Sequence, residues 1–266
     1  MDNMTAKVSC FTRAYHYKNN SIHIFTDDIA EKLLGEDYNQ IAKSMSDGID
    51  FFCPGFEGTR EEGLRLILDR QLSPSVLGRS VFCESKLAYA IANGCKQYLV
   101  FAAGYDTYAL RNKDSAIKVY ELDYPELLKD KAERIKKANL KASAVNVPCD
   151  LADLEWKNEL LTVGYDKDMN GVKKIYLYCN RSGLFYLDVV KGIDDRRKTQ
   201  MLASGAGEQM KALYSHKEVD MILDKHGFKI EEHLDENDMT YRYFREYNQA
   251  NPMHQMNAPV GVGYVY

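Results

Sequence analysis

Residues 94–131 read GCKQYLVFAAGYDTYALRNKDSAIKVYELDYPELLKDK, and they carry the clearest indication of the fold. Residues 98–103 are a short apolar run between polar residues, which is typical of a buried parallel strand. A second run, residues 117–122, follows a short crossover, and Pro125 then opens a charged amphipathic segment, where Pro is favoured as the first helical residue. Strand, glycine turn, crossover and second strand with terminal acids predict the nucleotide-binding half of an open α/β sheet.

The chain on both sides of this stretch extends the α/β pattern. Residues 1–92 are predicted to be helical, and helical spacing is clearest in segments 29–34, 61–72 and 80–93. Downstream, apolar runs alternate with amphipathic segments, which predicts strands at 142–148, 175–179, 228–234 and 260–266 and helices near 154–161 and 217–227. No linker, repeat or low-complexity segment interrupts the 266 residues. We therefore expect one domain, with a helical cap over 1–92 and a Rossmann-like core over 93–266.

Composition narrows the class of protein. Hydrophobic residues make up 45% of the chain and charged residues 28%, as in ordinary globular proteins. The net charge is −4 and no basic block is present, so a nucleic-acid partner is not expected. The six cysteines are scattered without a CxxC pair, which favours reduced thiols in a cytoplasmic protein and disfavours a metal site. Neither a secretory signal nor an apolar run long enough to span a membrane is recognisable.

The turn at residues 102–107, AAGYDT, is the first candidate site. A dinucleotide fingerprint, G-x-G-x-x-G, needs small residues where the pyrophosphate meets the backbone. Here its first position is Ala102 and its last is Thr107, so a pyrophosphate cradle is poorly supported. A ligand without phosphates, with a sulfonium and an amino-acid tail, needs no such cradle. A simple turn between a strand and a helix remains the alternative.

Acidic residues follow the second and third predicted strands. Glu121 and Asp123 stand where a carboxylate accepts hydrogen bonds from ribose hydroxyls in nucleotide-binding sheets. Asp150 and Leu151, after the third strand, could bind an adenine amino group and pack against its ring. Asp123 and Asp150 could equally cap the helices that follow them.

Two arginines, Arg13 and Arg79, are candidates for a charge-assisted pair with a ligand carboxylate, although a lone arginine is usually a surface residue. Tyr105 and Tyr186 are candidates for lining the side of the site that faces an acceptor. The six histidines have no metal-binding spacing, and no Ser/His/Asp or Cys/His set stands out, so no catalytic residue is named.

Taken together, these residues resemble the bacterial small-molecule branch of the leucine carboxyl methyltransferase-like S-adenosylmethionine-dependent O-methyltransferases. The shared elements are Arg79, the turn 102–107 with Arg111 behind it, Glu-Leu-Asp-Tyr-Pro at 121–125, and Asp150-Leu151. The resemblance implies a class I methyltransferase sheet, mostly parallel with an antiparallel last strand, and S-adenosylmethionine as cofactor. The acceptor it implies is a carboxylate or hydroxyl of a small molecule.

The resemblance also assigns roles to individual residues. Arg79 and Gly104 would hold the methionine part of the cofactor, and Ala102 and Asp106 of the same turn would also bind the cofactor. Glu121 and Asp123 would face the ribose, and Asp150-Leu151 the adenine.

Residues 175–200 depart from the family pattern, because one helix and one strand of the core are missing or rewritten there. Two other functions therefore stay open. One is a protein that binds S-adenosylmethionine or S-adenosylhomocysteine without turnover. The other is a nicotinamide-dependent oxidoreductase, which the missing third glycine disfavours.

Overall fold

The computed structural model describes residues 3–112, 117–153, 155–167, 177–179, 216–227, 230–259 and 264–265. The chain divides into two compact units. The first, called the sheet unit here, comprises Met1–Asn19, Thr26–Gly48 and Cys83–Arg181. The second unit comprises Asn20–Phe25, Ile49–Phe82 and Ser182–Tyr266. The single domain and the cap boundary expected from the sequence stay predictions.

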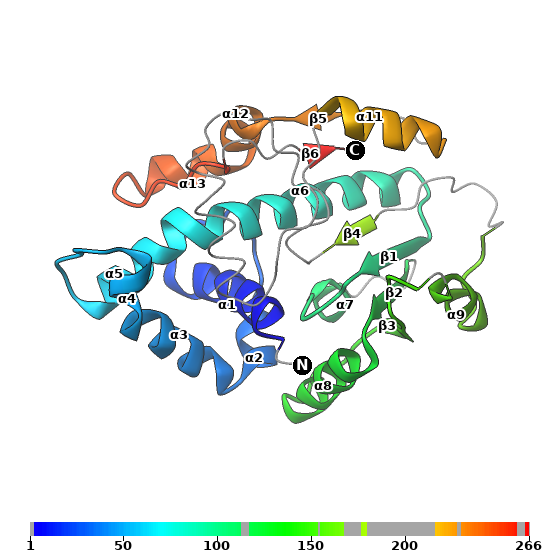
Figure 1. The fold of residues 1–266 in the computed structure, drawn as a ribbon, viewed down its shortest axis with the longest axis horizontal. Coiled ribbons are helices and arrows are strands. Elements are labelled where there is room, and N and C mark those ends of the chain that lie inside the picture. Colours follow the sequence, from blue (N-terminus) through cyan, green and yellow to red (C-terminus); the bar gives the residue numbers. More distant parts are fainter. Residues whose placement is uncertain are drawn as a thin grey trace. The chain divides into compact units, whose positions relative to one another are not determined.

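The sheet unit is built on four parallel strands in the order β3-β2-β1-β4 (Figure 1). The strands are β1 (Gln97–Phe101), β2 (Lys118–Asp123), β3 (Ala144–Pro148) and β4 (Leu177–Cys179). Between neighbouring strands, Phe101 is in register with Leu122, and Asp123 with Pro148. This parallel sheet with helices confirms the predicted Rossmann-like class I methyltransferase fold, and each strand lies within two residues of its expected start and end.

Helices cover both faces of this sheet. On one face, α9 (Trp156–Thr162) places Leu160 in a cluster with Tyr120 and Leu122. The side chain between those two, Glu121, points to the opposite face, as alternation along a strand requires. There it meets α8 (Pro125–Lys137), which begins at the proline that the sequence indicated.

The N-terminal part of the sheet unit is helical, as predicted. It contains α1 (Met4–Asn19), α2 (Ala30–Leu34) and α3 (Asp37–Asp47), and a short α7 (Tyr108–Arg111) follows β1. The rings of Phe11 and Tyr38 pack 5.0 Å apart between α1 and α3. Gly35 ends α2 with a φ of 58°, the left-handed conformation expected of glycine at a helix C-terminus.

The helices predicted at 61–72 and 80–93 are not separated by a loop. α5 (Arg60–Ile67) passes into a π-helical turn (Leu68–Leu72), and α6 (Ser73–Ala92) follows at once. Pro74 directly follows the π-helical turn, where the N–H of Ser73 bonds to the carbonyl of Leu68, so the proline lies where the helical hydrogen-bond pattern changes. Between Gly35 and Pro54 the chain forms α3 and α4 (Ile49–Phe52), in line with the helical prediction for residues 1–92.

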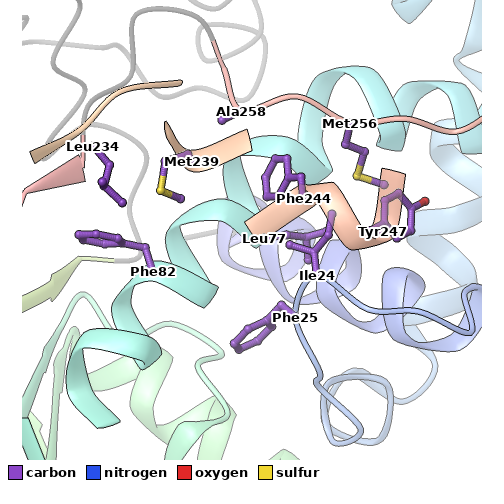
Figure 2. Packing of buried hydrophobic residues seen from close by; sticks show 10 residues of the cluster. All are labelled: Ile24, Phe25, Leu77, Phe82, Leu234, Met239, Phe244, Tyr247, Met256 and Ala258. Atoms are coloured by element: carbon purple, nitrogen blue, oxygen red, sulfur yellow. The ribbon is translucent and has the colours of Figure 1, made fainter. Parts of the chain in front are cut away.

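The second unit has its own apolar core, drawn in Figure 2. Leu77 and Phe82 enter it from α6, and Ile24 from the segment after α1. The C-terminal elements supply the rest: β5 (His233–Leu234), α12 (Glu236–Met239), the π-helical turn Thr240–Phe244 and α13 (Arg245–Ala250). A further helix, α11 (His216–Lys225), precedes them.

The last strand, β6 (Tyr264–Val265), pairs antiparallel with β5 in a two-stranded sheet of its own. None of the helices within the described ranges is long and apolar enough to cross a membrane. Most of the atypical section 175–200 lies outside the described residues, which include only β4 from it.

Candidate functional site

The candidate site is at the carboxyl ends of β1, β2 and β3, where residues 102–107 form a tight turn. Ala102 and Gly104 both adopt left-handed backbone conformations, with φ of 50° and 52°. The N–H of Asp106 donates to the carbonyl of Ala103 at 2.8 Å, which closes the turn. Residues 102–107 are all buried, so packing restrains the conformation of this turn.

Asp123, at the end of β2, binds this turn directly. Its Oδ2 accepts a hydrogen bond from the N–H of Gly104 at 2.8 Å, and its Oδ1 accepts one from the N–H of Tyr124, also at 2.8 Å. Its backbone carbonyl accepts from the N–H of Cys149 at 2.9 Å, just beyond β3. The turn, the end of β2 and the loop after β3 are therefore joined through one residue.

Asp150 and Leu151 follow at the same edge of the sheet. The Asp150 side chain is exposed, and its Oδ1 accepts from the N–H of Ala152 at 2.9 Å. Leu151 is half-buried against the cluster that contains Leu122 and Leu160. Asp150 thus caps a local turn, and its position beside Asp123 also leaves it available to a ligand.

Glu121 points into the interior of the sheet unit. Its Oε2 accepts from Nζ of Lys131 on α8 at 2.6 Å, and both side chains are almost fully buried. Burial raises the pKa of the Glu121 carboxyl, and the nearby Lys131 ammonium works against that rise. Among the predicted ribose ligands, Asp123 is the acid whose carboxylate reaches the turn, while a ribose contact of Glu121 stays a prediction.

Arg13 is buried on α1 and also contacts the turn. Its Nε donates to Oδ2 of Asp27 at 2.8 Å, and its second terminal nitrogen donates to the carbonyl of Tyr105 at 2.8 Å. Asp27 in turn accepts from the hydroxyl of Thr107 at 2.7 Å. The structure places Arg13 among protein partners, and the predicted contact with a substrate is untested.

The phenol of Tyr105 points away from the turn toward α8. Its hydroxyl donates to Oδ2 of Asp130, and the guanidinium of Arg134 lies 5.3 Å from the centre of its ring. Burial and the hydrogen bond to Asp130 raise the pKa of Tyr105. The backbone of Tyr105 therefore belongs to the turn, while its side chain packs between the turn and α8.

Asp106 and Arg111 complete the region. Oδ1 of Asp106 accepts from the N–H of Tyr108 at the start of α7. Arg111, at the end of α7, forms a two-pronged ion pair with Glu84 of α6. Burial raises the pKa of the Glu84 carboxyl, and the hydrogen bond from Arg111 opposes the change.

For two candidates the predicted contact with the cofactor or substrate stays a prediction. Arg79 lies on α6, in a part of the chain that belongs to the second unit, and is half-buried. Tyr186 lies outside the described residues. In the described part of the chain, no group of His, Cys, Asp and Glu is arranged to hold a metal ion.

Sequence reasoning missed three residues that organise the site: Asp27, Glu84 and Lys131. Asp27 accepts from the N–H of Ala30 at the start of α2, and nothing in the local sequence indicates its contact with Thr107. No sequence signal pairs Lys131 with Glu121, although a buried acid on a predicted strand implies a cation on the helix that covers it.

The donor and acceptor groups suit a cationic nucleoside with hydroxyl groups. Each oxygen of Asp123 accepts one protein N–H, and a carboxylate can accept about four hydrogen bonds in all, so capacity for hydroxyls remains. Asp106, Asp123 and Asp150 follow three adjacent strands, and carboxylates there can pair with a sulfonium or an ammonium. The residues therefore fit S-adenosylmethionine in charge and hydrogen bonding.

Comparisons with known proteins point to one family. The model of the leucine carboxyl methyltransferase family matches residues 6–174, which include every candidate residue above except Tyr186. YktD of Bacillus subtilis is 28% identical over 276 residues, 91% of this chain and 91% of that protein.

Shorter matches come from two further bacteria. A protein of Mycobacteroides abscessus is 37% identical over 91 residues, 33% of this chain and 30% of its own length. One of Saccharopolyspora erythraea is 32% identical over 99 residues, 36% of this chain and 34% of its own length. All three relatives are named as S-adenosyl-L-methionine-dependent methyltransferases.

Proposed function

The chain belongs to the leucine carboxyl methyltransferase family of S-adenosylmethionine-dependent methyltransferases, and from that premise we propose that it methylates an oxygen of a small molecule. The acceptor group is a carboxylate or a hydroxyl. The observation that carries the proposal is the contact between Asp123 and the N–H of Gly104, which places an acid at the glycine turn. An acid at the end of the second strand is where nucleotide-binding sheets hold a ribose.

Individual residues take the following roles in this proposal. Asp123 binds the ribose hydroxyls, with Glu121 behind it. Asp150 accepts from the adenine amino group, and Leu151 packs against the ring. Residues 102–106 hold the methionine part through backbone groups, and Arg79 pairs with its carboxylate.

S-adenosylmethionine, when bound, would supply a methyl group on a positively charged sulfur: the acceptor oxygen would bond to the methyl carbon in line as the carbon–sulfur bond breaks, with the neutral thioether S-adenosylhomocysteine as the leaving group. The task of the protein is then to orient donor and acceptor and to exclude water. The buried turn fixes the donor side, because Asp123 and Arg13 hold its backbone groups at Gly104 and Tyr105. A carboxylate acceptor needs no general base, whereas a hydroxyl acceptor would need one.

The acceptor side is proposed to involve Arg13, Tyr105 and Tyr186. For Tyr105 the support is its position in the turn, next to Gly104. Its phenol donates to Asp130 and its carbonyl accepts from Arg13, so Tyr105 is proposed to act through its place in the turn rather than through its hydroxyl.

The test is calorimetric titration of S-adenosylhomocysteine into the wild-type protein and into Asp123→Asn and Asp123→Ala. We expect micromolar binding by the wild type and a loss of about 1–3 kcal/mol in Asp123→Ala, which removes a buried hydrogen-bonding group. Asp123→Asn keeps an acceptor for the N–H of Gly104 but loses the charge, so its affinity for S-adenosylhomocysteine should lie between those of the wild type and Asp123→Ala. Glu133→Ala, an exposed acid on α8, is the matched control and should bind like the wild type.

Methyl transfer from labelled S-adenosylmethionine to a panel of small carboxylates and alcohols then tests the reaction. Binding without transfer to any acceptor would favour a cofactor-binding protein without turnover. Tight binding of a nicotinamide dinucleotide, with none of S-adenosylhomocysteine, would overturn the proposal.

A further inference from the structure

Asp27 is the centre of a buried polar cluster beside the turn. Its side chain has no exposed surface and lies just before α2, far from the turn in sequence. Oδ2 accepts from Nε of Arg13 at 2.8 Å and from the hydroxyl of Thr107 at 2.7 Å. Oδ1 accepts from the N–H of Ala30 at 3.1 Å and lies 3.6 Å from Nε of Arg111.

This cluster holds the turn at two places. Arg13, fixed by Asp27, donates to the carbonyl of Tyr105 at 2.8 Å. Thr107 donates its hydroxyl proton to Asp27 and accepts from Nε of Arg111 at 3.1 Å. Asp106 lies between these two anchored residues, so the direction of its backbone and side chain is fixed from both sides.

Asp123 supplies a third anchor from another element. It holds the N–H of Gly104, whereas the Asp27 cluster holds the carbonyl of Tyr105 and the side chain of Thr107. Three consecutive parts of the turn are therefore fixed by groups on β2, on α1 and before α2. A turn fixed in this way is preorganised, and less ordering remains when a ligand binds.

The cluster pairs charges of opposite sign. Arg13 and Arg111 are positive, and Asp27 and Glu84 are negative. Buried charges persist when they are paired and hydrogen-bonded, and removal of one leaves its partner uncompensated. The cluster is therefore sensitive to single changes, and Thr107 is the member that links it to the turn without carrying a charge.

We propose that Asp27 and Thr107 are positioning residues for the cofactor turn, acting on S-adenosylmethionine affinity through the backbone of residues 104–107. This inference rests on the proposed function. Neither residue needs to touch the cofactor. Their effect is to keep the turn in its binding conformation before the cofactor arrives.

The experiment compares Thr107→Val with Thr107→Ser in titrations with S-adenosylhomocysteine. Valine keeps the shape of threonine but has no hydroxyl, so Asp27 loses one donor and the turn loses one anchor. We expect Kd to rise about tenfold, equal to about 1.4 kcal/mol. Serine keeps the hydroxyl, so the Kd of Thr107→Ser should lie within about threefold of the wild-type value, a difference in binding free energy of less than about 1 kcal/mol.

Two controls separate positioning from general destabilisation. Thr162→Val removes a local hydrogen bond on the exposed face of α9 and should leave Kd unchanged. Hydrogen exchange should become faster in peptides that span residues 102–110 of Thr107→Val, with β3 unchanged. Asp27→Asn, which keeps the shape but not the charge, should raise Kd by at least as much as Thr107→Val.

The outcomes distinguish the two proposals. Wild-type protein that is folded but does not bind S-adenosylhomocysteine contradicts the proposed function. Wild-type binding with an unchanged Kd in Thr107→Val, whatever its stability, overturns the positioning role and leaves the proposed function intact. Equal losses in Thr107→Ser and Thr107→Val would also overturn it, because the hydroxyl would then not be the group that matters.

Discussion

Nζ of Lys131 on α8 lies 2.6 Å from Oε2 of Glu121 on β2, and the two side chains are only 2% and 3% exposed. This buried ion pair joins α8 to β2 in the interior of the sheet. Glu121 lies two residues before Asp123 on that strand. Such a pair adds little net stability compared with apolar residues of similar volume, but removal of one partner is costly. The pair therefore positions α8 more than it stabilises the fold.

The first prediction concerns this pair. Lys131→Met should lower the free energy of unfolding by about 3–5 kcal/mol, because it leaves the Glu121 carboxylate buried without a partner. The double variant Glu121→Gln, Lys131→Met should recover most of that loss. Urea unfolding followed by circular dichroism measures both. A loss below about 1 kcal/mol in the single variant would show that Glu121 is already neutral or solvated.

A further variant, Glu121→Gln alone, tests the predicted contact of Glu121 with ribose. If Glu121→Gln weakens S-adenosylhomocysteine binding as much as Asp123→Asn does, both acids face the ribose. If only stability changes, Asp123 alone is the ribose ligand.

The second prediction concerns Ala102, whose φ of 50° is costly for a residue with a Cβ. Ala102→Gly removes that strain but makes the unfolded chain more flexible, so we expect a net gain of about 0.5–1 kcal/mol. Thermal unfolding should show a higher Tm. Ala103→Gly is the matched control, because the φ of Ala103 is not positive.

In that control, loss of a buried methyl group and added unfolded-state entropy should destabilise the protein by about 1–2 kcal/mol. If Ala102→Gly proves as harmful as Ala103→Gly, the left-handed conformation of Ala102 carries no strain of consequence.

The third prediction concerns the stability of the protein at low pH. Burial acts to raise the pKa of Asp37, but hydrogen bonds and ion pairs with Lys7 and Arg134 outweigh it and lower that pKa below its usual value of 3.8. A carboxyl whose folded-state pKa is depressed stabilises the protein above its unfolded-state pKa. The contribution is lost as pH falls through that value toward the folded pKa. The free energy of unfolding should therefore decrease as the pH is lowered below about 4.

Asp37→Asn measures this contribution. The ion pairs are partly exposed, so the variant should lose only about 0.5–1 kcal/mol at neutral pH. Its stability should also depend less on pH between about 3 and 5 than that of the wild type, since one depressed carboxyl is gone. Equal pH slopes for the two proteins would contradict the assignment to Asp37.

The fourth prediction concerns the start of α5 in the second unit. Thr59 and Glu62 form a reciprocal capping box, in which the N–H of Glu62 donates to the Thr59 hydroxyl and the N–H of Thr59 donates to Glu62. Thr59→Ala should cost about 1 kcal/mol of stability, and Thr59→Ser less than about 0.5 kcal/mol. Urea unfolding measures both losses of stability. Similar losses in the two variants would mean that the methyl group of Thr59, rather than its capping hydroxyl, stabilises the helix.

Much of the sheet unit could be predicted from local patterns. The apolar runs around Leu99 and Tyr120 and the proline at 125 place β1, β2 and α8 to within two residues, because each signal lies inside the element that it specifies. The acid at Asp123 was recognised for the same reason, as it ends a strand and precedes a helix. The uninterrupted helical turns from α5 to α6 were missed, since a proline in a first helical turn and a proline in a loop look alike in sequence.

The parallel α/β class, the glycine turn and the acids at the strand ends follow from the order of residues along the chain, since neighbouring residues set local conformation. The partners of those residues do not follow from it. Asp27 meets Thr107, 80 residues away, and Lys131 crosses from α8 to Glu121. Apolar spacing determines which face of an element is buried, but only the packing of that face against another element brings one buried charge to its partner.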